Sequence, residues 1–291
     1  MTLPDLPYLG AGLSYQHRRH ADYLEHRDSI DFLELPTDVL VRHLDAWRDD
    51  VLEISRRFPT VAHGIHMGLG DARGVRRDYL DRARRCFELF DPVWCSDHLD
   101  MSNFAPDEEM LAHGVVVPFT RDQAQVFTRN IATASELLGR PLIVENLFYD
   151  FVVPMASSLP EPGFIAAALA GTEAGLLLDV TNLHINARNL GFDPYQWLEA
   201  APLERVVEIH VAGSERRRTG ALEGRWYDSH SRPVPDEDWE LVEYVARHSD
   251  VDVKALVVER DRNDPPMAEL LDELAVGRSL LERSRQPVPM S

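Results

Sequence analysis

The stretches PLIVENL (residues 141–147) and GLLLDVTNLH (residues 175–184) share one pattern, in which a short apolar run ends in a carboxylate. The segment between them, residues 163–170, has a helical pattern. Short apolar runs that alternate with helical segments are typical of βαβ units, in which the strands run parallel. The two stretches therefore predict parallel strands whose carboxyl ends carry Glu145 and Asp179.

The same alternation extends along the chain and gives eight candidate strands. They cover residues 8–14, 29–35, 60–67, 92–98, 141–146, 175–182, 205–212 and 254–260. Helical patterns fall between most of them, at residues 41–57, 76–90, 121–138, 163–170, 194–201 and 236–248, with a last one at 266–283. Eight such units predict an α/β fold, the (β/α)₈ TIM barrel, which about 250 residues can form as one domain. We therefore expect residues 1–291 to form a single TIM-barrel domain.

A doubly wound open sheet is the structural alternative. Its glycine-rich fingerprint is incomplete here, because GAGLSYQ at residues 10–16 lacks the third glycine. Two connections are longer than simple units require, namely residues 101–120 after the fourth strand and residues 213–235 after the seventh. Long loops inside a compact barrel are usually functional or mobile.

The composition is that of a soluble, acidic protein. Hydrophobic residues make up 44% of the chain, and 49 Asp+Glu against 30 Lys+Arg give a net charge of −19. Such a surface repels a phosphate backbone, so we expect no nucleic-acid partner, whereas cations or a basic peptide would be attracted. The acidity could equally serve solubility alone.

The compartment follows from the cysteines and the N-terminus. Cys86 and Cys95 lack metal-ligand spacing and make no disulfide framework, which favours a reducing cytoplasm. The start MTLPDLPYLGAGL has no signal-peptide pattern, and no stretch reaches the ~18 apolar residues of a membrane span. We expect a cytoplasmic protein without a membrane segment.

Histidines and carboxylates stand at the ends of most expected strands. They are Glu34, His63, Asp97, His98, Glu145, Asp179, Glu208, His210 and Glu259. In a barrel these ends converge on one mouth, where active sites lie. Isolated charges there are costly unless they are paired or bind a metal. Imidazoles and carboxylates without thiolates suit iron, manganese or zinc, and their number predicts more than one ion.

The long loop after the seventh strand contains a further pair, Asp228 and His230. Being two residues apart, they point the same way in an extended segment and could close the site from above. An exposed turn is the alternative. The arginines at residues 216–218 nearby could guide an acidic peptide or simply be solvated.

Several single residues keep two interpretations. His66 would face away from His63 on an extended strand, so His63 is the better inward candidate. Glu34 could pair with an arginine instead of facing the site. His98 could be a loop histidine, and His184 lies beyond the strand.

Seven strings, taken together and in order, carry a family resemblance. They are HGIHMGLG (63–70), SDHL (96–99), IVENL (143–147), LLLDVTNLHINARN (176–189), EIHVAG (208–213), DSHSRPVPD (228–236) and VVER (257–260). With them the chain resembles the multinuclear non-heme iron-dependent oxidative enzymes, such as the methanobactin-biosynthesis oxidase and the 3-thiaglutamate-pathway enzyme. The resemblance extends from about residue 10 to residue 273 and implies a xylose-isomerase-like barrel.

The resemblance also implies a ligand set and roles. Motif by motif, the metal ligands would be His63, His98, Glu145, Asp179, Asn182, His210, Asp228, His230 and Glu259. Glu145, His98 and Asp228 would act in catalysis, with Glu145 as the candidate bridge between ions.

The chain departs from the family's pattern at three places. Leu147 replaces a proline, Ser214 replaces a histidine, and ELPTD at residues 34–38 lacks the usual Glu-Asn ending. None of these changes removes a ligand, so we expect them to alter the substrate pocket.

The implied activity is oxidation of a cysteine, or of a neighbouring residue, in a ribosomally synthesised precursor peptide. The cofactors would be two or three iron ions in mixed Fe²⁺/Fe³⁺ states, and O₂ would be the co-substrate. A small partner protein that binds the leader peptide is expected as well.

Three other interpretations use the same barrel. A sugar isomerase or epimerase with Mn²⁺ or Mg²⁺ would want a lysine near the mouth, whereas Lys254 begins a strand at the far end. A trinuclear-zinc hydrolase of the endonuclease IV type would need a basic groove, which the net charge disfavours. A non-catalytic metal-storage or scaffold protein is the third.

Overall fold

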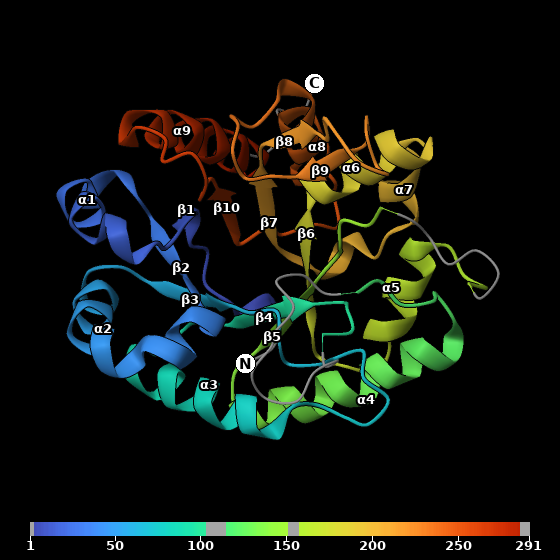
Figure 1. The fold of residues 1–291 in the computed structure, drawn as a ribbon, viewed down its shortest axis with the longest axis horizontal. Coiled ribbons are helices and arrows are strands. Elements are labelled where there is room, and N and C mark those ends of the chain that lie inside the picture. Colours follow the sequence, from blue (N-terminus) through green and yellow to red (C-terminus); the bar gives the residue numbers. More distant parts are fainter. Residues whose placement is uncertain (1–2, 103–114, 151–156, 286–291) are drawn as a thin grey trace.

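The computed structural model describes residues 3–102, 115–150 and 157–285, in which eight parallel strands close into a barrel (Figure 1). These strands are β1 Gly10–Ser14, β2 Phe32–Pro36, β3 Thr60–His63, β4 Cys95–His98, β5 Leu142–Glu145, β6 Gly175–Asp179, β7 Val206–Ala212 and β10 Ala255–Glu259. They follow the chain order around the barrel, and β10 closes it by pairing with both β7 and β1. The expected (β/α)₈ barrel is confirmed, and the open sheet is excluded.

Helices surround the strands on the outside of the barrel (Figure 1). They are α1 His20–Glu25, α2 Thr37–Arg57, α3 Arg77–Phe90, α4 Arg121–Leu138, α5 Glu161–Leu169, α6 Val180–Leu190, α7 Pro194–Ala200, α8 Asp236–Ala246 and α9 Met267–Ser284. Their buried faces carry leucine, isoleucine, valine and phenylalanine, and α2, α3 and α4 follow one another along the lower edge in Figure 1. Apolar stripes that face the sheet are the expected source of the barrel's outer core.

The sequence placed the end of two strands too late. The strand expected at residues 175–182 ends at Asp179, and α6 begins at the next residue. Asp179 Oδ1 accepts the Asn182 amide at 2.7 Å, which caps the first turn of α6 and ends the strand. The strand expected at residues 60–67 ends at His63, and α1 and α6 were not expected at all.

The half of the barrel interior nearer the amino ends of the strands is apolar. Its side chains come from successive strands and pack on each other and on Leu6; they include Phe32, Val61, Trp94, Ile143, Leu177, Val207 and Val257. Gly12 of β1 lies here without a side chain, because a Cβ would stand 2.7 Å from the Phe32 ring. The layer fills the barrel with side chains, as in other barrels of this size.

The half of the interior nearer the carboxyl ends of the strands is polar. Side chains alternate along a strand, so the residue two positions after an inward apolar residue faces inward again, nearer the carboxyl end. Five strands follow this rule with Glu34, His63, Glu145, Asp179 and Glu259. The same period of two therefore builds an apolar floor and a polar layer above it.

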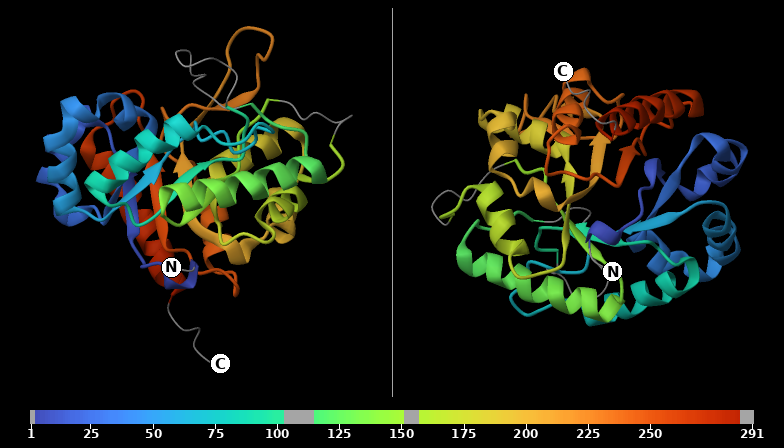
Figure 2. Two further views of the ribbon diagram at one scale, coloured as in Figure 1. Left: turned by 90° about the horizontal axis from the view of Figure 1, so that it is seen from below. Right: turned by 180° about the vertical axis from the view of Figure 1, so that it is seen from behind.

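The mouth of the barrel carries the long segment after β7. It forms a two-stranded antiparallel ribbon, β8 Ser214–Arg216 and β9 Trp226–Asp228, that the sequence did not predict. This segment projects from the side opposite the N-terminus (Figure 2, left). Gly213 lets the chain cross here, because a Cβ would lie 1.9 Å from Arg232 O. Of the other long connection, residues 103–114 lie outside the described part.

Within the described ranges, none of the helices combines the length and the apolar character that a membrane span requires.

Candidate metal centre

Three groups of buried histidine and carboxylate side chains meet in the polar layer of the barrel. Each group offers ligand atoms within 4.8 Å of one another: His63, His98 and Glu145; Glu145, Asp179 and His210; and Glu34, Glu208 and His210. Glu145 belongs to the first two groups and His210 to the last two. A continuous constellation of potential ligands therefore spans β2 to β7.

Glu145 lies at the centre of this constellation. Its Oε2 lies 3.0 Å from His98 Nε2 and 3.4 Å from His63 Nε2. Its other oxygen, Oε1, lies 3.9 Å from His210 Nδ1. Atoms that bind one ion at about 2.1 Å lie about 3.0–3.4 Å apart at octahedral or tetrahedral angles. The two oxygens of Glu145 thus point to two different sets of ligands.

Hydrogen bonds behind the rings set the tautomers of His63 and His98. His98 Nδ1 lies 3.1 Å from the carbonyl oxygen of Gly64, which can only accept. His63 Nδ1 lies 2.7 Å from Ser96 Oγ, whose own proton goes to Ala62 O. Both Nδ1 atoms therefore carry hydrogen, and both Nε2 atoms present lone pairs toward Glu145. Burial lowers the pKa of His98 to about 4 and holds the pKa of His63 well below its usual range. This is the neutral form that binds metals.

Asp179 and Asn182 form one side of the site. Asp179 Oδ1 is used in capping α6, whereas Oδ2 is buried and has no hydrogen-bond partner among the described residues. Asn182 Oδ1, in the first turn of α6, is likewise buried and unpartnered. Asn146 holds the strand end in place, because its side chain bonds both the Asp179 amide and the Asp179 carbonyl, at 2.9 Å each. One rigid helix start thus offers two oxygens to the centre.

Glu259 approaches from the last strand and contacts two histidines. Its Oε2 lies 3.1 Å from His210 Nδ1 and 3.9 Å from His230 Nε2. Burial opposes ionisation of Glu259, but the charges of His210 and His230 outweigh it and hold its pKa below the usual range. Burial likewise opposes a charge on His210, yet Glu259 and Glu34 raise its pKa well above the usual range. In the metal-free protein, His210 therefore carries an extra proton and lies as a cation between Glu34 and Glu259.

Asp228 and His230 reach the site from the ribbon at the mouth. His230 Nε2 lies 2.6 Å from Asp228 Oδ2, and the backbone of His230 is left-handed, with φ of 52°. That conformation is strained for a histidine and persists where surrounding structure enforces it. It turns the ring back toward Asp228 and Glu259, so both residues line the upper edge of the cluster.

The carboxylates of the cluster are not neutralised by lysine or arginine side chains of the described residues. Among the described residues, no lysine or arginine forms an ion pair with Glu34, Glu145, Asp179, Asp228 or Glu259. Burial raises the pKa of Glu145 and of Asp179 well above the usual range. Unpartnered buried atoms of the described residues include Glu145 Oε2, Asp179 Oδ2, Asn182 Oδ1, His210 Nδ1 and Asp228 Oδ1. Such atoms are costly without a cation, so the donor set fits bound metal ions.

All nine expected ligands lie at this mouth. His63, His98 and His210 contact Glu145, and His210 contacts Glu259. Asp179 is grouped with Glu145 and His210, Asn182 adjoins Asp179, and Asp228 and His230 join through Glu259. His66 lies away from the cluster, where its Nδ1 contacts Asp38 Oδ1 at 2.6 Å. His184 also lies apart and contacts Asp238.

Of the two interpretations of Glu34, the structure supports the one in which its side chain faces the site. It pairs with no arginine among the described residues, and its Oε2 lies 3.0 Å from His210 Nε2. Behind it, Glu208 accepts a hydrogen bond from Trp94 Nε1 at 2.8 Å. The alternation that places Glu34 two residues after Phe32 could have marked it as inward-facing, but nothing local identifies His210 as its partner.

A cavity of about 450 Å³ opens above the cluster. His98, Asn182 and Asp228 line its inner end, and apolar side chains such as Val116, Leu147 and Phe148 form walls. Clefts of this size hold small ligands or a few residues of a peptide.

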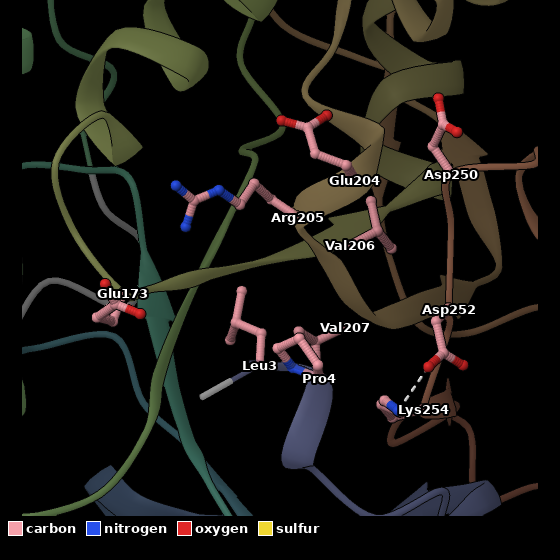
Figure 3. A pocket seen from close by; sticks show the side chains of 10 residues that line it. All are labelled: Leu3, Pro4, Glu173, Glu204, Arg205, Val206, Val207, Asp250, Asp252 and Lys254. Atoms are coloured by element: carbon pink, nitrogen blue, oxygen red, sulfur yellow. Dashed lines mark hydrogen bonds and ion pairs between the residues drawn. The ribbon is translucent and has the colours of Figure 1, made fainter. Parts of the chain in front are cut away.

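A second cavity, of about 360 Å³, lies at the opposite end of the barrel (Figure 3). Lys254 lines it, and its Nζ lies 2.6 Å from Asp252 Oδ2. Glu173, Glu204 and Asp250 surround the same space as separate side chains. This lysine is therefore remote from the metal-ligand cluster, as the sequence predicted, and cannot serve as the base that a sugar isomerase would need there.

Comparison with known proteins gives a family and a fold. Residues 10–282 match the family described as RiPP precursor modification enzyme MbnB/TglH/ChrH. The chain is 36% identical over 281 residues to a UPF0276 protein of Caulobacter vibrioides, with 96% of each chain covered. It is also 36% identical over 274 residues to a UPF0276 protein of Rhizorhabdus wittichii, covering 92% of this chain and 94% of the relative.

Solved structures of two other proteins share the xylose-isomerase-like barrel. A 3-keto-D-glucoside 4-epimerase from E. coli superposes with a TM-score of 0.55 at 14% identity, over 93% of this chain and 99% of the epimerase. Endonuclease IV from Thermus thermophilus superposes with a TM-score of 0.53 at 16% identity, over 95% of this chain and 100% of the endonuclease. At such low identities the likeness extends to the fold alone.

Proposed function

The chain belongs to the RiPP precursor modification enzyme family MbnB/TglH/ChrH, and on that premise we propose that it is an iron-dependent oxidase. It would use O₂ to oxidise a cysteine, or a neighbouring residue, of a ribosomally synthesised precursor peptide. Two or three iron ions, in mixed Fe²⁺/Fe³⁺ states, would be held at the barrel mouth. The protein would work in the cytoplasm, with a small partner that binds the leader peptide.

The observation that carries the proposal is the position of Glu145 between two ligand groups. One oxygen faces His63 and His98, and the other faces the group of His210. A carboxylate placed in this way is suited to bridge two ions. The complete proposed ligand set is His63, His98, Glu145, Asp179, Asn182, His210, Asp228, His230 and Glu259.

The donor set supports iron among the possible metals. It consists of imidazole, carboxylate and amide oxygen, without thiolate, and such sites suit iron, manganese or zinc. The resemblance of the sequence motifs to the iron-dependent oxidative enzymes is our reason for choosing iron among these. Iron, when bound, supplies the redox chemistry that couples oxidation of the substrate to reduction of O₂.

The protein's own residues would position the substrate and manage protons. His98, Asn182 and Asp228 line the inner end of the mouth cavity, so a substrate group there meets the proposed ligands directly. Val116, Leu147 and Phe148 would exclude water from that end. Asp228 Oδ1, which is buried and has no hydrogen-bond partner among the described residues, is placed to accept a proton from an arriving thiol.

The decisive experiment starts from protein purified without oxygen. We expect two or three iron ions per chain, and oxygen consumption when a cysteine-containing precursor peptide, encoded beside the gene, is added with its partner protein. Mass spectrometry should show loss of hydrogen or rearrangement at the cysteine in the same samples. Zinc as the only metal, or peptide turnover without oxygen consumption, would contradict the proposal.

A further inference from the structure

The mouth cavity is also lined by two arginines that the metal centre does not use. Arg217 follows the ribbon strand β8, and Arg262 follows β10. Neither guanidinium forms an ion pair with a carboxylate of the proposed ligand set within the described residues. Neither cation is therefore neutralised by the acidic cluster, although the protein has a net charge of −19.

Arg217 is held in place but retains free donors. Its Nη2 lies 3.1 Å from Asp150 Oδ2, and its guanidinium carbon lies 4.9 Å from the centre of the Tyr227 ring. Its Nε is buried and has no hydrogen-bond partner in the described part of the chain. An arginine has five N–H donors in a rigid planar fork. The contacts with Asp150 and Tyr227 thus hold the guanidinium group in place and leave some of its N–H donors free.

Arg262 is exposed and is anchored only through its backbone. Its amide donates to His230 O at 3.2 Å, which ties its position to the proposed metal ligand. Its guanidinium makes no hydrogen bond or ion pair with any residue in the ranges that the structure describes. It can therefore move toward a ligand in the cavity without breaking a contact.

We propose that Arg217 and Arg262 bind a carboxylate of the substrate while its thiol group reaches the inner end of the same cavity. Arginine forks bind carboxylates through paired, charge-assisted hydrogen bonds. The inner end is lined by His98, Asn182 and Asp228, which belong to the proposed ligand set, so a thiol there would reach the iron. The cavity thus offers arginine side chains as well as the proposed metal ligands, and a substrate that carries both a carboxylate and a thiol could use both.

This inference rests on the proposed function, since it assumes that a thiol is the reacting group. The carboxylate could be a chain terminus or the side chain of a neighbouring acidic residue. Both sources have the same chemistry, and a comparison of small thiols separates them. The substrate class that follows is a cysteine with a carboxylate within about two residues of it.

The test uses iron-loaded, anaerobic protein and three probes. N-acetylcysteine has a terminal carboxylate, N-acetylcysteine amide has none, and N-acetyl-Cys-Asp-amide has only a side-chain carboxylate. Binding is followed by calorimetry and by the visible absorption that a thiolate gives on iron. We expect at least one carboxylate probe to bind ten times more tightly than the amide, and the tighter of the two identifies the source.

Variants locate the effect. Arg217→Gln and Arg262→Gln should each reduce the preference for the carboxylate probe, and the double variant should abolish it. Arg218→Gln is the matched control, because Arg218 is exposed, carries the same charge and does not line the cavity. It should keep the preference.

The two hypotheses fail in different ways. If all three probes give the visible band with equal affinity, or if the preference survives the double variant, the arginine site is wrong and the thiol-binding centre stands. If the Arg218→Gln control loses the preference as well, the effect is one of general charge and the arginine site is again wrong. If no probe gives a band, the proposed function fails together with this inference.

Discussion

His210 Nε2 lies 3.0 Å from Glu34 Oε2, and both side chains are completely buried in the barrel. Glu34 belongs to β2 and His210 to β7, so the contact crosses the barrel interior. A carboxylate next to Nε2 holds the proton on that nitrogen and leaves Nδ1 facing Glu145 and Glu259. Partners of this kind orient metal-binding histidines and raise their basicity. Glu34 is therefore a positioning residue for His210.

Replacing Glu34 tests this role. Glu34→Leu removes the acceptor for the Nε2 proton, so we expect the affinity for iron to fall about 10–100-fold. Glu34→Gln keeps an acceptor oxygen but removes the charge, and its loss should be smaller. Titration of the metal-free protein with Fe²⁺ against a competing chelator measures both affinities.

Glu208→Gln is the matched control for Glu34. Glu208 is equally buried, but its Oε1 lies 4.0 Å from His210 Nε2, beyond hydrogen-bond distance. The glutamine oxygen can still accept the Trp94 hydrogen bond. Iron affinity should stay within a factor of about three. Equal losses for Glu34→Gln and Glu208→Gln would show that loss of any buried carboxylate in this layer lowers the affinity, and that the contact with His210 has no special role.

Glu145 and Asp179 should differ in how much iron they hold. Glu145 belongs to two ligand groups, so Glu145→Gln should reduce iron below one ion per chain. Asp179→Asn leaves the group of His63, His98 and Glu145 intact and can still cap α6, so about one ion should remain. Metal analysis after anaerobic desalting measures the content.

The buried Glu161 provides the comparison for these two variants. It accepts hydrogen bonds from Tyr149 and Trp197 and belongs to none of the ligand groups. Glu161→Gln should keep the full iron content. Unchanged iron in Glu145→Gln would remove that residue from the centre.

The barrel and its mouth could be predicted because the relevant signals are local. Runs such as LIVE and LLLD carry both the strand and the inward carboxylate within four residues. Once the strand count gives a barrel, Glu145 and Asp179 must meet, whatever separates them along the chain.

The remaining features depend on contacts that leave no local pattern. The start of α6 follows from the Asp179 cap. The apolar run before the cap continues into Val180, however, and this pattern predicts a longer strand. The pairing of Glu34 with His210 joins residues 176 positions apart. The ribbon β8–β9 pairs residues across a turn in a polar loop, where propensity gives little guidance.

The two cysteines should be dispensable for the reaction. Cys86 and Cys95 are free thiols, completely buried, and outside the ligand groups. Burial raises the pKa of Cys86 to about 11 and also raises that of Cys95, so neither supplies a thiolate. The double variant Cys86→Ala/Cys95→Ala should keep its iron and its oxygen consumption, while stability falls by about 1–2 kcal/mol. Loss of oxygen consumption with full iron content would assign the thiols a role in the reaction.

Glu161 should make stability depend on pH. Its side chain is buried, and burial raises its pKa to about 7, although the hydrogen bonds from Tyr149 and Trp197 act in the opposite direction. In the unfolded chain an ordinary glutamate titrates near 4.5. Between these values the folded protein binds more protons than the unfolded chain, so stability is complete below about pH 4.5 and falls as pH rises toward 7. The loss amounts to about 3 kcal/mol.

Glu161→Gln isolates this contribution from that of the other buried carboxyl groups. Glutamine does not titrate, so the variant should lack the part of the slope between about pH 4.5 and 7 that urea unfolding measures in the parent protein. Glu136→Gln is the control. Glu136 is exposed on α4, so this variant removes the same charge from a side chain that is not buried. Its profile should parallel that of the parent. A Glu161→Gln profile parallel to the parent as well would mean that this carboxyl group is ionised in the folded protein, and that Tyr149 and Trp197 stabilise the anion more than burial destabilises it.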